Sequence, residues 1–217
     1  DNKVTLLAGV TDDLIEKEER NKDRVRLLLD RHGILFRELL RREAPAFQWS
    51  RVFRSLRLME LSGEVLTGVF FRDIPGPQFI LPRAFPTLRD KLPEDSVYWM
   101  NATDPASLPG VQIDALKGIL PSRIPSTHLV YRGTKIVAVS QRYGRVLTFH
   151  EPPEDPRIQE YLIVLRHLLT REFQPLHTIT IEIINDQDAA QSPYVEAFRV
   201  AFEVRMDYKS VKLFQKT

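Results

Sequence analysis

The residues with the clearest chemical potential in this chain are arginines near its start. Residues 20–60 carry eleven basic and five acidic side chains, a surplus of six, although the whole chain of 217 residues has a net charge of only +2. Ten of the eleven cations are arginine, which can form two parallel hydrogen bonds with a phosphate or a guanine edge. Such a local surplus indicates a nucleic-acid-binding surface. The alternative is a solvated face on which arginines pair with carboxylates at helical spacing.

A winged helix would hold these arginines, because this part of the chain reads as three helices followed by a two-stranded hairpin. Glycine or proline follows each helix, since glycine tolerates a left-handed cap and proline cannot continue a helix. A Pro-Gly-Pro turn at residues 75–77 separates the two strands. The predicted elements are helices 21–32, 34–43 and 49–61 and strands 64–71 and 78–81.

The third of these helices, 49–61, is the candidate recognition helix. Its apolar residues recur at the three-and-four spacing of a buried stripe. Arg51, Arg54 and Arg57 fall on the other faces. We therefore expect these three arginines to contact phosphate groups.

Beyond residue 82, closely spaced prolines exclude long helices and favour short strands. The pattern predicts an α+β fold, in which the winged helix precedes a small β-barrel or curved sheet with flanking helices. The expected domains are an N-terminal extension or linker (1–19), a winged helix (20–92) and a β-barrel-like α+β domain (93–217). The predicted elements of the last domain are strands 97–101, 127–131, 135–140, 145–150, 178–184 and 204–214 and helices 154–172 and 192–202.

A second candidate contact lies at the turn between the strands 135–140 and 145–150. Arg142, Tyr143 and Arg145 place two guanidinium groups and an aromatic ring on this turn. A phosphate or an unstacked base could rest there. A hairpin tip with solvated charges is the alternative, and the residues leave both interpretations open.

Composition excludes several kinds of site. The chain has no cysteine, which rules out disulfides, thiol nucleophiles and cysteine zinc sites. Its five histidines lie too far apart in sequence for a helical zinc pair, so no metal site is expected. No stretch reaches the roughly 18 apolar residues that a membrane helix needs, so we expect no membrane partner and a cytoplasmic location.

Several runs of residues carry a resemblance to a known family. They are Arg31 to Leu40, Gly68 to Phe71, Gly76 to Pro82, Asn101 to Pro105, Arg123, Gly133 to Val139, Arg142 to Phe149, Ser192 to Ala197 and Asp207 to Lys209. Together they resemble the region that follows the motor in Lhr-type (large helicase-related) DNA helicases. The resemblance covers about residues 21–213. Where that family often has an aromatic residue and glycine after its Asp-Pro, this chain has Leu108-Pro109-Gly110.

The resemblance implies a superfamily 2, ATP-dependent DNA helicase of the DNA repair class as the parent protein. This chain has no glycine-rich phosphate loop ending in Gly-Lys-Ser or Gly-Lys-Thr and no Asp-Glu-x-His box. We therefore expect no cofactor here, and ATP and Mg²⁺ in motor domains elsewhere. The expected role is to grip or guide the translocated strand, with DNA, single-stranded or hybridised to RNA, and the motor domains of the same chain as partners. A start at Asp1 without methionine favours an excised C-terminal region over a stand-alone protein.

Whether this region is itself an enzyme is left open by a second hypothesis. The combination of domains is similar to AlkZ-like DNA glycosylases, and some Lhr-type C-terminal regions are associated with removal of uracil from DNA. Such chemistry needs a carboxylate or glutamine to position water, and the candidates are Gln78, Asp104 and Asp207. Each also has a structural alternative, since these residue types close turns or pair with neighbouring cations. The double-glutamine signature of AlkZ-like proteins is missing, because position 76 is glycine.

A third hypothesis is an interaction module without DNA contact. In this case the winged helix would dock against the motor domains. Binding that is absent or insensitive to salt would favour docking, since phosphate contacts weaken steeply as salt rises.

Overall fold

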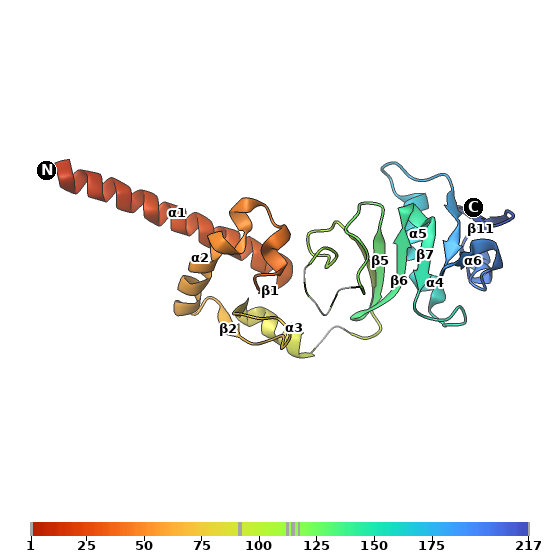
Figure 1. The fold of residues 1–217 in the computed structure, drawn as a ribbon, viewed down its shortest axis with the longest axis horizontal. Helices are drawn as coiled ribbons and strands as arrows, with labels where there is room; N and C mark the ends of the chain where they lie inside the picture. Colours follow the sequence, from red (N-terminus) through yellow and green to blue (C-terminus); the bar gives the residue numbers. More distant parts are fainter. Residues whose placement is uncertain (1, 91–92, 112, 114–115, 117, 217) are drawn as a thin grey trace. The chain divides into compact units, whose positions relative to one another are not determined.

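The computed structural model describes residues 2–90, 93–111, 113, 116 and 118–216, with side chains from Asp13 onward. The chain divides into two compact units (Figure 1), and each has its own hydrophobic core. The first unit comprises Asp1–Lys91 and Gly110–Leu120, and the second comprises Leu92–Pro109 and Pro121–Thr217. Helices and sheets are mixed in the chain, which confirms the α+β class.

The first unit has the element order of a winged helix. Its antiparallel sheet has the order β1-β3-β2, so the last strand lies in the middle and forms the wing hairpin with β2. The core of the unit joins the C-terminal part of α1 to α2 and β3. Its elements are α1 (Asn2–His32), β1 (Ile34–Leu35), η1 (Leu39–Arg42), η2 (Pro45–Phe47), α2 (Trp49–Leu61), β2 (Leu66–Gly68), β3 (Gln78–Ile80), η3 (Pro82–Ala84) and α3 (Phe85–Asp90).

The structure corrects the helix that was expected over 34–43. Ile34–Leu35 is a strand paired with β3, and only Leu39–Arg42 forms a 3-10 turn. Gly33 has a left-handed backbone, with φ of +71°, and ends α1 as the expected glycine cap. The pairing buries Leu35 completely. An isolated ten-residue helix is only marginally stable, so the strand with its buried side chain is favoured.

α1 begins at Asn2, well before the expected start at residue 21. Residues 2–19 therefore belong to the same helix as residues 21–32. Side chains one turn apart support this part of α1: Arg20 lies 3.7 Å from Glu16, and Lys22 lies 2.7 Å from Glu19.

The second unit contains a six-stranded sheet with the order β10-β9-β7-β6-β5-β4. Neighbouring strands are antiparallel, except that β7 and β9 are parallel. Within the described part of the chain, the edge strands β4 and β10 do not pair, so the sheet is open and the barrel alternative is wrong. Its strands are β4 (Val97–Asn101), β5 (His128–Arg132), β6 (Lys135–Gln141), β7 (Val146–Phe149), β9 (Ile183–Ile184) and β10 (Gln187–Asp188).

Three helices and a second sheet complete the core of this unit. The expected helix 154–172 is divided at Leu162, where ψ is 2°. The expected strand 178–184 contributes to two different sheets, and 204–214 is a hairpin whose turn is closed by Asp207 N donating to Ser210 O at 2.8 Å. The elements are α4 (Ile158–Tyr161), α5 (Ile163–Thr170), α6 (Val195–Ala201), β8 (Ile179–Ile181), β11 (Glu203–Met206), β12 (Val211–Phe214) and the 3-10 turns η5 (Arg142–Gly144) and η6 (Ala189–Gln191).

Candidate nucleic-acid interface

α2 presents a row of arginines to solvent. Val52 and Leu56 are fully buried on its inner face, so the helical repeat turns Arg51, Arg54 and Arg57 outward. The side chains of Arg54 and Arg57 are 85% and 54% exposed. In a helix-turn-helix protein, the corresponding helix enters the major groove of DNA.

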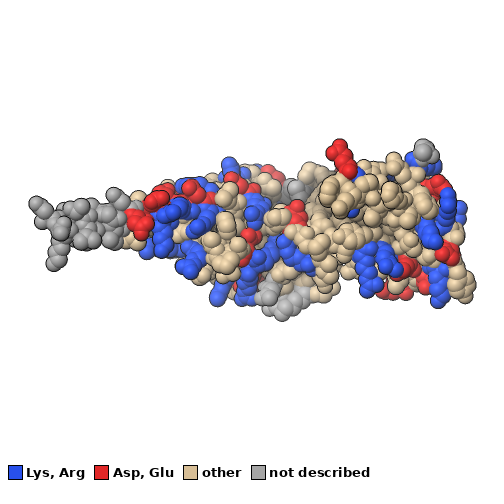
Figure 2. All heavy atoms as spheres, turned by 90° about the horizontal axis from the view of Figure 1, so that it is seen from above, with Lys and Arg blue, Asp and Glu red and all other residues tan. Residues whose placement is uncertain are grey.

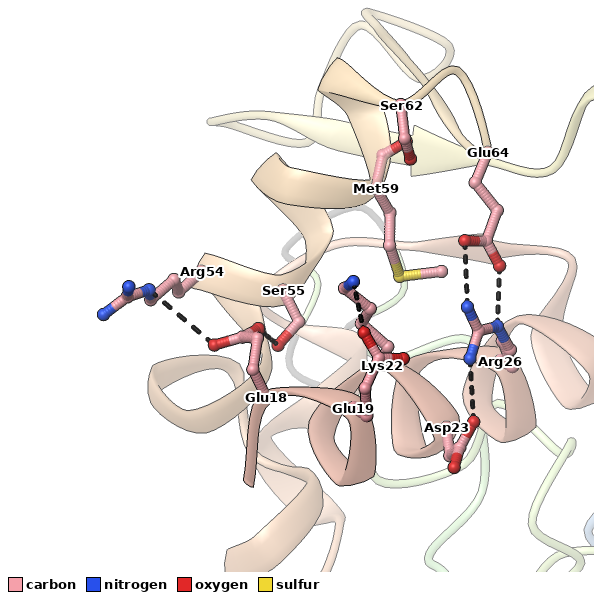
Figure 3. Close-up of polar contacts among 10 residues, drawn as sticks. All are labelled: Glu18, Glu19, Lys22, Asp23, Arg26, Arg54, Ser55, Met59, Ser62 and Glu64. Atoms are coloured by element: carbon pink, nitrogen blue, oxygen red, sulfur yellow. Dashed lines mark hydrogen bonds and ion pairs between the residues drawn. The ribbon is translucent and has the colours of Figure 1, made fainter. Parts of the chain in front are cut away.

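Two of these three arginines lie beside acids. Arg54 Nε is 3.7 Å from Glu18 Oε2 of α1 (Figure 3), and Arg57 Nη1 donates to Glu60 Oε2 at 2.5 Å. Ser55 donates to the other Glu18 oxygen at 2.5 Å, which fixes this carboxylate between α1 and α2. Among the described residues, none forms a hydrogen bond or ion pair with the side chain of Arg51.

Arg26 is held by carboxylates from two segments. It donates to both oxygens of Glu64 at 2.7 and 3.1 Å and to Asp23 at 2.7 Å (Figure 3). These bonds raise the pKa of Arg26, and the bond with Arg26 lowers the pKa of Glu64. Arg26 therefore ties α1 to the segment before β2, which is a structural role.

Other cations of the first unit also have acidic neighbours. On the face drawn in Figure 2, blue cations and red acids lie next to one another. Residues 13–64, a window that includes all of these acids, carry twelve basic and ten acidic residues. The surplus of six positive charges over residues 20–60 therefore falls to two when the neighbouring acids of residues 13–64 are included. The further pairs are Arg20–Glu16, Lys22–Glu19, Arg31–Glu43 and Arg83–Asp30.

A groove beside α2 gathers several of the remaining cations. It has a volume of about 460 Å³. Arg24 in its wall donates to the neutral Asn21 Oδ1 at 2.6 Å, and no acid among the described residues pairs with its guanidinium. The charged residues that line it are Lys17, Glu18, Arg24, Arg51 and Arg54.

Gln78 organises the loop of the wing. Its side chain is fully buried. Oε1 accepts from the backbone N–H groups of Phe70 and Phe71 at 3.0 and 2.8 Å, and Nε2 donates to the carbonyls of Phe71 and Ile74 at 2.8 and 2.9 Å. The loop backbone thus uses both donors and the acceptor of the amide. This geometry fits the turn-closing alternative for Gln78.

The candidate carboxylates of the second unit also lie at turns. Asp104 Oδ1 accepts from Ala106 N at 2.8 Å. Asp207 Oδ1 accepts from Tyr208 N at 2.8 Å, and this bond, with Lys212 at 3.5 Å, lowers the pKa of Asp207. Among the described residues, no hydrogen bond or ion pair joins the two carboxylates.

The described residues offer neither a metal site nor a membrane span. No three His, Asp or Glu side chains in the described part of the chain gather closely enough to hold a metal ion. None of the helices, as far as they are described, is both long and apolar enough to span a bilayer.

The turn between β6 and β7 has a strained backbone. Arg142 and Tyr143 adopt left-handed conformations with φ of 51° and 55°. Each such conformation costs about 1–3 kcal/mol at a non-glycine residue and persists only where the surroundings hold it. Tyr143 N donates to Ser126 O at 3.0 Å, and Gly144 is so close to Ile179 that an added Cβ would lie 2.6 Å from its Cγ2. These contacts fix the turn, and Tyr143 remains 43% exposed.

The two arginines of this turn differ in their partners. Arg145 pairs with Glu182, which raises the pKa of Arg145. Within the described part of the chain, no acid or hydrogen-bond partner engages the side chain of Arg142. The turn therefore offers one free guanidinium beside an exposed ring.

Next to Tyr143 lies a cluster of rings that the sequence analysis did not identify as a site. The ring centroid of His128 is 6.4 Å from that of Tyr143 and 5.6 Å from that of Trp99. The ring centroid of Trp99 is 4.7 Å from that of His167. Burial lowers the pKa of His128 to about 4, so this side chain is neutral at pH 7. These residues are far apart in sequence, and the pairing of Asn101 with His128 across β4 and β5 brings Trp99 and His128 together.

A comparison with known families agrees with this geometry. The family model of the winged-helix domain of large helicase-related protein matches residues 15–100, which include the arginine row and the wing. A search of curated proteins found no match for the chain. The family match supports a helicase-associated role in nucleic-acid binding. Residues 15–100 are therefore a winged-helix domain of the type found in large helicase-related protein.

Proposed function

We propose that this chain is an accessory DNA-binding region of a helicase, in which the exposed arginines of α2 grip the backbone of the translocated strand. The observation that carries the proposal is the outward row of Arg51, Arg54 and Arg57 on the recognition helix, with Arg51 unpaired among the described residues. A guanidinium can offer two parallel N–H groups to one phosphate. The ATP- and Mg²⁺-dependent motor of the repair helicase would lie outside this chain.

The acids beside this row do not prevent phosphate binding. Glu18 lies 3.7 Å from Arg54, beyond hydrogen-bond distance, and both Arg54 and Arg57 are more than half exposed. Surface ion pairs contribute only about 0–1 kcal/mol. Phosphate contacts release condensed counterions, which favours exchange of a carboxylate for the DNA backbone.

The test compares wild-type protein with an Arg51→Ala/Arg54→Ala/Arg57→Ala variant. Binding to a fluorescein-labelled single-stranded oligonucleotide is measured by anisotropy between 50 and 200 mM salt. The wild-type affinity should fall about tenfold or more over this range, because several phosphate contacts are lost to screening. The variant should bind about tenfold more weakly at 50 mM salt. The slope of log affinity against log salt for this variant should be smaller by about 2, because each of the three lost phosphate contacts contributes roughly 0.7 on a single strand.

A charge-matched control is the triple Arg→Lys variant at the same positions. It should keep most of the salt slope, because lysine still contacts phosphate as a point charge. An Arg199→Ala/Arg205→Ala variant removes two cations from the second unit and should leave the affinity nearly unchanged. Equal affinity and slope for the wild type and the Ala triple variant would contradict the proposal and favour protein docking.

A further inference from the structure

The β6–β7 turn presents an aromatic ring in a fixed position. Two consecutive left-handed residues, Arg142 and Tyr143, project the ring and one free guanidinium from the sheet. The backbone bond from Tyr143 to Ser126 and the close packing of Gly144 hold this geometry before any ligand arrives. Strained turns of this kind cluster at ligand-binding sites. A ring that is already ordered also loses little conformational freedom when it binds.

Two buried polar atoms on the neighbouring strands β5 and β6 lack hydrogen-bond partners among the described residues. Asn101 Oδ1 accepts from Thr103 N at 2.8 Å, and Nδ2 donates to Pro125 O at 2.8 Å, so the orientation of the amide is fixed. Nδ2 also lies 3.1 Å from His128 Nε2, which must therefore accept, and the proton of neutral His128 is on Nδ1. Among the described residues, this Nδ1 has no hydrogen-bond partner, and neither has Ser140 Oγ.

These two unpartnered atoms lie on the strands that lead into the neighbourhood of the turn. His128 and Ser140 are each only 4% exposed, and they lie directly opposite each other across β5 and β6. Side chains buried to this degree almost always have a hydrogen-bond partner. The cluster beside Tyr143 is thus polar and incompletely satisfied, unlike the apolar core of the same unit.

We propose that Tyr143 stacks on one unpaired base of a single-stranded nucleic acid, while Arg142 contacts the adjacent phosphate. This inference rests on the proposed function, because it also requires that the chain binds nucleic acid. It assigns a separate contact site, in the second unit. An exposed ring beside a cation is the combination that single-strand-binding proteins use. Glu182 engages Arg145, so among the described residues Arg142 is the guanidinium of this turn that can contact a phosphate without exchanging a carboxylate. Duplex DNA does not fit, because its bases are already stacked.

The test uses the whole chain and an oligonucleotide that contains one 2-aminopurine, whose fluorescence falls when it stacks on an aromatic ring. Wild-type protein and Tyr143→Phe should both quench this signal. Tyr143→Asn should abolish the quenching and weaken binding about tenfold, since a stacked base contributes about 1–3 kcal/mol. Asparagine tolerates left-handed backbone, so this variant keeps the turn while removing the ring. Unchanged quenching and affinity in Tyr143→Asn would overturn the proposal.

Further measurements separate this site from the arginine row of α2. At saturating protein concentration, the triple Arg→Ala variant of α2 should still quench 2-aminopurine, even though its affinity is lower. If the triple variant binds like the wild type and the quenching depends on Tyr143, the proposed role of α2 fails and the stacking site stands. Arg142→Ala should keep the quenching and lower the salt slope by about 0.7. If neither a DNA nor an RNA oligonucleotide shows quenching that depends on Tyr143, stacking is refuted. Quenching with either one supports stacking, and a difference between the two shows the sugar preference.

Discussion

The arginine row of α2 and the β6–β7 turn differ in how they make cations available. The row contains three arginines on a regular helix, and Glu18 and Glu60 lie beside two of them. The turn contains two arginines, and within the described part of the chain a carboxylate partner is found for Arg145 alone. Each surface thus keeps one free guanidinium, Arg51 in the row and Arg142 in the turn, among the described residues. The placement of acids therefore decides how many cations can meet a phosphate without first giving up a carboxylate.

The two regions also differ in backbone strain. α2 is a regular helix of 13 residues, whose conformation its own hydrogen bonds and buried face maintain. The turn contains two left-handed non-glycine residues, so its geometry depends on the packing of Gly144 and on the strands at either side. The second unit should therefore be more sensitive than the first to small changes around its site.

The largest expected effect is from Gly144→Ala. Gly144 has φ +92°, and an added Cβ would lie 2.6 Å from Ile179 and 3.2 Å from Leu165. Left-handed strain of about 1–2 kcal/mol and overpacking of about 1–3 kcal/mol should together lower the free energy of unfolding by about 3 kcal/mol. Urea denaturation followed by Trp99 fluorescence in a Trp49→Phe background measures this change in the second unit.

Gly76→Ala provides the matched control for that prediction in the first unit. Gly76 has a similar φ of +87°, but an added Cβ would meet no atom within 4 Å. Only the backbone strain applies, so the loss should be about 1 kcal/mol. Trp49 fluorescence in a Trp99→Phe background reports it. Equal losses at the two glycines would show that the turn is not more tightly constrained than the wing.

A smaller loss of stability is expected when the pH is lowered. His128 has a folded-state pKa of about 4, against 6.5 for an ordinary histidine, because burial and then the neighbouring His167 and Arg171 disfavour its charged form. Between pH 6.5 and 4 the unfolded chain binds this proton and the folded chain does not, so the second unit loses stability as pH falls. The loss by pH 5 should be about 2 kcal/mol. Urea midpoints from pH 7 to pH 5 measure it, and His128→Gln should remove most of this dependence.

His32 of the first unit has a buried side chain too, and its pH dependence can be compared with that of His128. Burial also lowers the pKa of His32, but Glu43 lies 3.6 Å away and raises it. The acid sensitivity that His32 confers should therefore be weaker. Identical pH dependence in wild type and His128→Gln would show that His128 is not the group responsible.

Sequence patterns predicted the parts of the molecule that depend on local periodicity. The range of α2 was predicted correctly, because its apolar stripe is continuous and Gly63 ends it. The strands 97–101, 127–131, 135–140 and 145–150 agree with β4 to β7 to within a residue or so at their ends. The family resemblance agrees with the winged-helix match over residues 15–100.

The features that sequence patterns missed depend on partners far along the chain. β1 forms because Ile34 pairs with Ile80, and a local pattern of apolar residues cannot reveal that pairing. The cluster around His128 depends on strand register, since Asn101 is its cross-strand neighbour. Glu18 lies before residue 20, outside the window of the positive surplus, and α1 brings it beside Arg54. The early start of α1 at Asn2 is what places this acid there.

The smallest expected effect tests whether nearby acids limit the arginine row. In Glu18→Gln the amide oxygen can still accept from Ser55, which now bonds Glu18 at 2.5 Å, so the contact between α1 and α2 should persist. Only the negative charge 3.7 Å from Arg54 is removed. Affinity for a single-stranded oligonucleotide at 50 mM salt should rise about two- to threefold, in line with a surface pair of under about 1 kcal/mol.

A double-mutant cycle assigns that gain to the pair. In an Arg54→Ala background, Glu18→Gln should raise the affinity less, because the neutralised partner is gone. Glu196→Gln, which frees Arg199 in the second unit, is the charge-matched control and should have no such effect. An equal gain with and without Arg54 would mean that Glu18 acts through general repulsion of the strand. The availability of the row would then depend on the net charge of the unit, and not on whether each arginine is paired or free.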